Sequence, residues 1–143
     1  MSIRISDKHG VNPSLMQCFY CNEATTGIAL LGKLPGDAEA PRQGVFNLTP
    51  CDDCKAKMAQ GVLIMSCKDS DFKDANIVEQ GNLPNPYRTG GWVIVKDEAI
   101  QRIMPGLIDG DDQAKERYTN LILRRRWVFL GDSLWDAIGL PRN

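Results

Sequence analysis

Two pairs of cysteines, each with the spacing Cys-x-x-Cys, constrain the fold of this 143-residue chain more than any other feature. The first pair is Cys18 and Cys21, and the second is Cys51 and Cys54. Two such pairs in a short chain are the spacing of a tetrahedral thiolate site, most often for zinc. Because four thiolates fill every coordination position, such a metal is structural and does not activate water. We therefore expect the four cysteines to bind one structural zinc ion.

Three other uses of these cysteines remain open: a redox pair, an iron–sulfur cluster and disulfides. A redox motif needs only one pair, placed where a strand leads into a helix. Four cysteines alone do not distinguish zinc from an iron–sulfur cluster. Disulfides accompany secretion, but the first ten residues lack the apolar segment of a signal peptide. This start, and the lack of an apolar run of about 18 residues, predict a cytoplasmic protein without a membrane span.

The two cysteine pairs have different sequence surroundings. Asn22 follows the first pair, and asparagine tolerates the left-handed backbone conformation that a zinc knuckle often needs there. The second pair follows Thr49, an expected helix N-cap, and Pro50, which fits a first helical position. Free N–H groups at a helix start favour the thiolate form of cysteine. We expect a knuckle at the first pair and a helix that carries the second pair.

The rest of the sequence predicts a small α+β protein with two lobes. Residues 26–34 and 44–48 have the composition of two strands joined by a turn at 35–37, and residues 61–67 have that of a more buried strand. The predicted organisation is a zinc-binding module with an N-terminal arm (residues 1–67), a linker or long surface loop (68–91) and a C-terminal lobe (92–143).

The C-terminal lobe contains a weak internal similarity. Residues 92–100 align without gaps with residues 127–135, and each segment has an apolar strand followed by an aspartate, Asp97 or Asp132, that is placed to cap a helix. Another helix is expected over residues 112–125. The predicted order is therefore β-α-α-β-α. Duplication of a strand–helix unit and coincidence explain the similarity equally well.

A knuckle, a hairpin and then a helix that carries the second pair are the order of a treble-clef zinc finger. At roughly residues 15–62 the chain resembles treble-clef modules such as the N-terminal zinc domain of the Clp-family unfoldase. The hairpin between the pairs is longer here than in that module. The resemblance implies a treble-clef, zinc-ribbon-like module in front of the β-α-α-β-α lobe.

A second resemblance covers nearly the whole chain. It is to a family of small uncharacterised proteins of tailed phages and prophages. Its members often carry glycine after the first cysteine pair, where this chain has Asn22. The resemblance implies a phage or prophage origin but no activity. It is carried by the segments Lys8-His-Gly-Val-Asn-Pro-Ser14, Cys18-Phe-Tyr-Cys21, Gly36-Asp-Ala-Glu-Ala-Pro-Arg42, Pro50-Cys-Asp-Asp-Cys54 and Asn85-Pro-Tyr-Arg-Thr-Gly90.

The net charge of −1 argues against a dedicated duplex-binding protein, which would usually be basic. We expect a non-enzymatic binding protein that docks on a host protein or ribonucleoprotein complex and modulates it. Direct nucleic-acid binding is one alternative, and a homodimer is also compatible with the sequence. The candidate contact residues lie in the hairpin tip, the zinc-site helix, a proline-flanked loop and a basic cluster; they are Arg42, Lys55, Lys57, Tyr87, Arg88, Arg124, Arg125 and Arg126.

A small hydrolase or nuclease with zinc as scaffold is the other alternative. It would need an acid, a base and a nucleophile that converge. His9 is the only histidine, and no partner for it is evident in the sequence. Carboxylates such as Asp69 and Asp71 lie in turn or cap contexts. Cys67 follows a buried strand and is expected to be a buried thiol, and the three tryptophans are expected mainly in the core.

Overall fold

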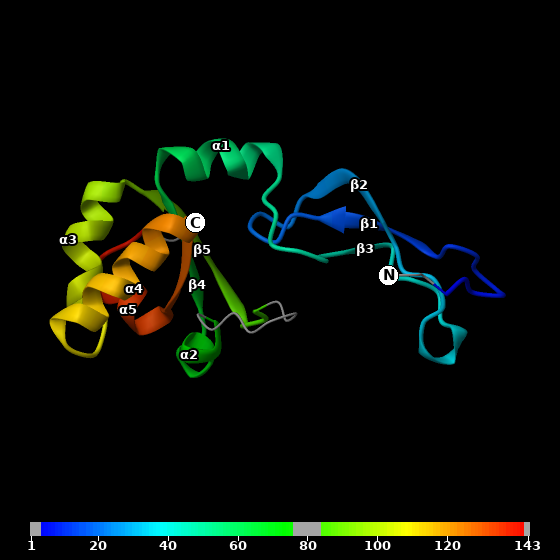
Figure 1. Cartoon of the computed structure of the whole chain (residues 1–143). Helices are drawn as coiled ribbons and strands as arrows, with labels where there is room; N and C mark the ends of the chain where they lie inside the picture. Colours follow the sequence, from blue (N-terminus) through cyan, green and yellow to red (C-terminus); the bar gives the residue numbers. More distant parts are fainter. Residues whose placement is uncertain (1–3, 76–83, 142–143) are drawn as a thin grey trace. The chain divides into compact units, whose positions relative to one another are not determined.

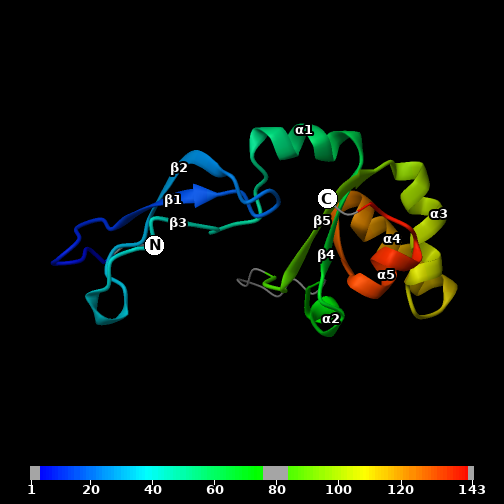
Figure 2. The same cartoon turned by 180° about the vertical axis from the view of Figure 1, so that it is seen from behind.

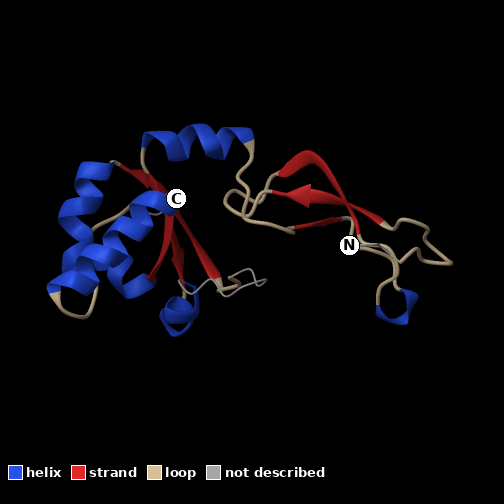
Figure 3. Cartoon of the chain, in the orientation of Figure 1, coloured by secondary structure: helices blue, strands red, loops and turns tan. Residues whose placement is uncertain are grey.

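The structure is a computed structural model that describes residues 4–75 and 84–141 (Figure 1). The chain divides into two compact units, Met1–Cys54 and Lys55–Asn143, and each is described separately. Both contain strands (Figure 3), and the described α-helices all begin after Cys51. The chain is therefore a mixed α+β protein with two small three-stranded sheets.

The first unit is built on a sheet with the strand order β2-β1-β3. Strand β1 (Pro13–Gln17) pairs antiparallel with β2 (Ala24–Leu30), and it pairs in parallel with the short β3 (Gln43–Gly44). A 3₁₀ turn, Pro35–Asp37, lies between β2 and β3. The predicted pairing of residues 26–34 with residues 44–48 is wrong, because β1 lies between β2 and β3. The hairpin instead joins β1 to β2, and the first cysteine pair lies in its connection.

Asn12 organises the loop that returns to β3. Its buried side chain donates to the backbone carbonyls of Gly32 and Ala38, at 2.8 and 3.0 Å, and its Oδ1 accepts from the N–H of Ala40 at 2.7 Å. Asn12 itself has a φ of 52°, in the left-handed region that asparagine tolerates. The side chain of Asn12 therefore satisfies backbone groups of this loop that have no partner strand to bond to.

The second unit is built on a sheet with the strand order β5-β4-β6. The central strand β4 (Val62–Cys67) is buried along its whole length, and it pairs antiparallel with β5 (Arg88–Val95) and in parallel with β6 (Trp127–Gly131). The helices α3 (Asp97–Leu107), α4 (Asp112–Arg125) and α5 (Asp132–Ala137) gather on one side of this sheet in two opposite views (Figures 1 and 2). Their apolar faces enclose the core, which comprises Val62, Ile64, Ile100, Met104, Ile122, Val128, Leu130 and Trp135.

The predicted order β-α-α-β-α of the C-terminal lobe is confirmed, and α4 has the predicted bounds. The expected capping roles of Asp97 and Asp132 are wrong. The helices α3 and α5 have Lys96 and Gly131 at their N-caps, and neither cap residue makes a side-chain cap bond. Asp97 forms an ion pair with Arg126 instead, and Asp132 accepts a hydrogen bond from Thr89.

The boundary between the units does not lie in residues 68–91, where the sequence predicts a linker. The two units divide between Cys54 and Lys55 because β4 pairs with β5 and β6 and so belongs to the second sheet. Residues 68–91 include the short helix α2 (Phe72–Ala75) and the first residues of β5, while residues 76–83 lie outside the described part of the chain.

Candidate metal centre

The four predicted metal ligands lie together in the first unit. The Sγ atoms of Cys18, Cys21, Cys51 and Cys54 all lie within 4.8 Å of one another. The Sγ atoms of Cys21 and Cys51 are 3.7 Å apart. A tetrahedron with metal–sulfur distances of about 2.3 Å has edges of about 3.8 Å, so the separation fits a shared metal ion. The sequence-predicted donor set is thus one group that could hold a metal ion.

The first pair lies in a tight turn between β1 and β2. The N–H of Asn22 donates to the carbonyl of Cys18 at 2.8 Å, and the N–H of Cys18 donates to the carbonyl of Glu23 at 2.9 Å. Asn22 has a φ of 62°, so the predicted left-handed residue after the pair is confirmed. These bonds turn the chain back on itself and bring both thiols to one side.

The second pair lies at the start of α1 (Asp52–Gln60). Cys51 directly precedes the helix and Cys54 lies in its first turn, so the predicted helix start at this pair is confirmed. The expected N-cap at Thr49 and the expected first helical position at Pro50 are both wrong, because the helix begins only at Asp52. Asp52 and Asp53 occupy the first turn, where the helix dipole stabilises negative charge.

Backbone N–H groups favour the ionised, thiolate form of the Cys18 side chain. Burial raises its pKa, but hydrogen bonds from the N–H groups of Cys51, Cys21 and Tyr20 outweigh burial and bring the pKa to about 7, from 9.0. Burial raises the pKa of Cys21 and of Cys54, and the neighbouring thiols raise that of Cys54 further. Four thiolates packed this closely repel one another, and a divalent cation removes that repulsion. The four side chains are therefore better suited to bind a metal ion as thiolates than to remain together as free thiols.

Tyr20 links the two halves of the site and was not predicted from the sequence. Its hydroxyl donates to the carbonyl of Leu48 at 2.7 Å, just before the second pair. Its ring meets that of Phe19 edge to face, with centroids 5.2 Å apart, and both side chains are buried. Cys18 and Cys54 are buried, while Cys21 and Cys51 are partly exposed. The sequence signal that could have indicated the role of Tyr20 is the aromatic pair between Cys18 and Cys21.

The predicted arginine cluster does not form one exposed patch. Arg126 donates to the carbonyls of Met58 and Leu123 and forms an ion pair with Asp97 at 3.0 Å. Arg125 stacks over Trp127, with its guanidinium carbon 4.2 Å from the ring centroid. Arg124 remains exposed.

The other predicted contact residues are spread over both units. Arg42, Lys55 and Lys57 are exposed, and the ammonium of Lys57 lies 5.1 Å from the ring centroid of Trp92. Tyr87 is 63% exposed, while Arg88 is partly buried, with its guanidinium 5.5 Å from the ring centroid of Phe129. Their role in binding a partner stays a prediction.

In the part of the chain that the structure describes, the remaining His, Cys, Asp and Glu side chains form no second cluster that could hold a metal ion. Cys67 is buried as predicted, and burial, together with the nearby carboxylates of Asp132, Asp71 and Asp69, raises its pKa to about 11. Asp69 accepts from the N–H and the hydroxyl of Ser133, at 2.9 and 2.6 Å. Among the described residues, the cysteine quartet is the only His, Cys, Asp and Glu cluster arranged to hold a metal ion.

Trp127 and Trp135 are buried as predicted, and Trp92 is partly buried. No helix in the described ranges has the length and apolar character needed to cross a membrane. Comparisons with protein-family models, with curated proteins and with solved structures find no match for this chain.

Proposed function

We propose that this chain is a non-enzymatic binding protein whose first unit is stabilised by one structural zinc ion. The closed set of four thiolates carries this proposal. With Cys18, Cys21, Cys51 and Cys54 as ligands, zinc has no open position for water or substrate. Zinc suits the site because it prefers tetrahedral thiolate coordination and brings no redox chemistry. The treble-clef assignment belongs to the same proposal, with the knuckle and the helix start as its support.

The hydrogen bonds of the second unit support a role without catalysis. Asp69 accepts two hydrogen bonds from Ser133, and Asp71 accepts from the N–H of Tyr87 at 3.0 Å. These carboxylates therefore fix loops of the fold. A general acid or base would need a reacting group within hydrogen-bond reach and a suitably tuned pKa.

A protein is the partner that best fits the described surface. Tyr87 is 63% exposed, yet its backbone is held: its N–H donates to Asp71 and its carbonyl accepts from the N–H of Lys68 at 3.0 Å. The ammonium of Lys68 lies 4.3 Å from the centroid of its ring. An exposed aromatic side chain on a fixed backbone is typical of an anchor in protein interfaces. We therefore place Tyr87 and Lys68 at the centre of the partner-binding surface.

The net charge of −1, with Arg125 and Arg126 engaged within the fold, favours a protein or ribonucleoprotein over naked nucleic acid. We further propose that the partner belongs to a host cell, on the strength of the phage-family resemblance. In this proposal the chain works in the host cytoplasm and modulates the assembly to which it binds.

Native mass spectrometry tests the metal, and one zinc per chain is expected. Affinity purification from a bacterial host, with the zinc-loaded chain as bait, tests the partner. Tyr87→Ala and Lys68→Ala should both reduce recovery of the same host protein, while Arg102→Ala, a change at an exposed residue of α3, should not. Equal recovery by all four baits would contradict the assignment of Tyr87. Binding to RNA or DNA that falls steeply with salt would instead support the nucleic-acid alternative.

A further inference from the structure

One face of the β1–β2 hairpin is apolar and exposed. Leu15 lies opposite Ile28 and Pro13 lies opposite Leu30, so the four side chains share one face of the sheet. Leu15 is 39% exposed, Ile28 60% and Leu30 47%. Apolar side chains that gather in this way usually mark an interaction surface.

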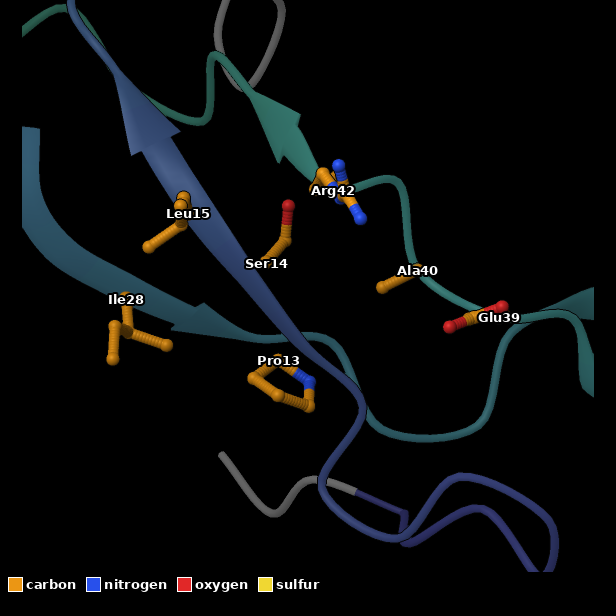
Figure 4. A pocket seen from close by; sticks show the side chains of 7 residues that line it. All are labelled: Pro13, Ser14, Leu15, Ile28, Glu39, Ala40 and Arg42. Carbon is orange, nitrogen blue, oxygen red and sulfur yellow. The ribbon is translucent and has the colours of Figure 1, made fainter. Parts of the chain in front are cut away.

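A hollow of about 540 Å³ lies on this face, beside the projecting side chain of Ile28 (Figure 4). It is lined by Pro13, Ser14 and Leu15 of β1, which lie between Ile28 and a segment that supplies Glu39, Ala40 and Arg42 (Figure 4). The face therefore offers both a protruding apolar side chain and a depression next to it.

The backbone of residues 41 and 42, beside the hollow, is hydrogen-bonded to β1. The hydroxyl of Ser14 donates to the carbonyl of Pro41 at 2.6 Å, and the N–H of Leu15 donates to the carbonyl of Arg42 at 3.0 Å. Glu39 and Arg42 are exposed, and within the described ranges neither takes part in an ion pair. One acidic and one basic side chain thus extend from this loop beside an apolar surface.

We propose that this face binds the same face of a second copy of the chain, so that Glu39 of each copy meets Arg42 of the other. In a two-fold interface, a contact from one residue to another always occurs twice, in both directions. A face with one acid and one base is therefore complementary to itself. Ile28 of each copy would enter the hollow of the other copy and become buried.

The charge pattern favours a second copy over the other occupants. A nucleic acid would require several cations on this face, and it carries Arg42 beside the acidic Glu39. An acidic peptide would pair with Arg42, but its carboxylates would also lie close to the negatively charged Glu39 and be repelled. This dimer goes beyond the proposed function, because its residues all belong to the first unit, whereas Tyr87 and Lys68 belong to the second.

Sedimentation equilibrium of the full zinc-loaded chain, from about 1 µM to about 200 µM, tests the dimer. Glu39→Arg and Arg42→Glu should each weaken association at least about tenfold, because each places two like-charge contacts in the interface. An equimolar mixture of these two variants should form a heterodimer close to wild-type affinity, since the mixture restores both contacts. Native mass spectrometry distinguishes the heterodimer by mass. Ile28→Glu should abolish association.

Glu116→Arg and Arg102→Glu make the same charge changes at exposed positions of the other unit, and both should dimerise like wild type. Zinc content measured in every variant confirms that the first unit is folded. A wild-type chain that stays monomeric across the range, or a mixture that yields no heterodimer, overturns the proposal. A purified wild-type chain that carries no zinc and still dimerises would contradict the metal assignment and leave the dimer standing, so the two failures are distinguishable.

Discussion

The N–H of Cys51 lies 3.4 Å from Sγ of Cys18, and so joins the two cysteine pairs before any metal is considered. This bond runs from the residue that precedes α1 to the knuckle between β1 and β2. It also helps to lower the pKa of Cys18. The backbone at the second pair therefore prepares the first pair for metal binding.

Replacing one ligand should remove the metal. Cys51→Ser should lower zinc occupancy from one per chain to near zero, because three thiolates and a weak hydroxyl ligand cannot match four thiolates. Inductively coupled plasma mass spectrometry of the purified protein measures the occupancy. Cys67→Ser is the matched control, since Cys67 lies in the other unit, and it should keep one zinc per chain.

The left-handed conformation of Asn22 predicts the order of three variants. Asn22→Gly should match or exceed wild-type stability, because glycine adopts a φ of 62° without strain. Asn22→Ala should cost about 1–2 kcal/mol, the usual penalty of a left-handed residue with a Cβ, and Asn22→Val should cost more. Urea unfolding of the zinc-loaded chain, with metal release as the signal for the first unit, measures the order of the three variants in stability. Equal midpoints for glycine and valine would contradict the turn geometry.

The cysteine site and much of the second unit could be predicted from the sequence because they depend on local chemistry. Cys-x-x-Cys spacing, the asparagine after the knuckle and the acidic start and basic end of α4 act within a few residues. The pairing of β1 with β2 and β3 could not be predicted, because it rests on long-range bonds such as those of Asn12. Alternation along β2 indicates two faces but not which face stays exposed.

Gly91 and Gly106 lie in the second unit and differ in the space around a possible Cβ atom. A Cβ at Gly91 would lie 2.6 Å from both Oγ of Ser66 and Cζ2 of Trp135, whereas a Cβ at Gly106 meets nothing within 4 Å. Gly91→Ala should therefore destabilise the unit by about 1–3 kcal/mol through overpacking. Gly106→Ala should stabilise it by about 0.5–1 kcal/mol, because Gly106 lies within helix α3. Thermal unfolding of the zinc-loaded chain measures both changes.

Arg126 should contribute more to stability than its exposed neighbour Arg124. It ties the end of α4 to α1 and α3 through the carbonyl of Met58 and the carboxylate of Asp97. Arg126→Met should cost about 1–3 kcal/mol, mostly because the partly buried backbone carbonyls lose their donor. Arg124→Met should stay within about 0.5 kcal/mol of wild type. Similar losses in both variants would show that the arginine cluster acts through charge alone.

Cys67 predicts how stability changes with alkaline pH. The thiol titrates near 9.0 in an unfolded chain, but its pKa is about 11 in the folded protein, because burial and the carboxylates of Asp132, Asp71 and Asp69 disfavour the thiolate. The folded state therefore holds this proton more tightly than the unfolded state does. Its contribution to stability is complete below pH 9.0 and is lost as the pH rises toward about 11.

Cys67→Ala removes this titration, so the free energy of unfolding of the variant should fall less steeply than that of wild type between these two pH values. Denaturant unfolding at several alkaline pH values compares the slopes. Because the two proteins share every other ionisable group, the difference between the slopes isolates the thiol. Parallel slopes would mean that the Cys67 thiol is accessible to solvent. In that case the thiol should also be alkylated rapidly in the folded, zinc-loaded chain.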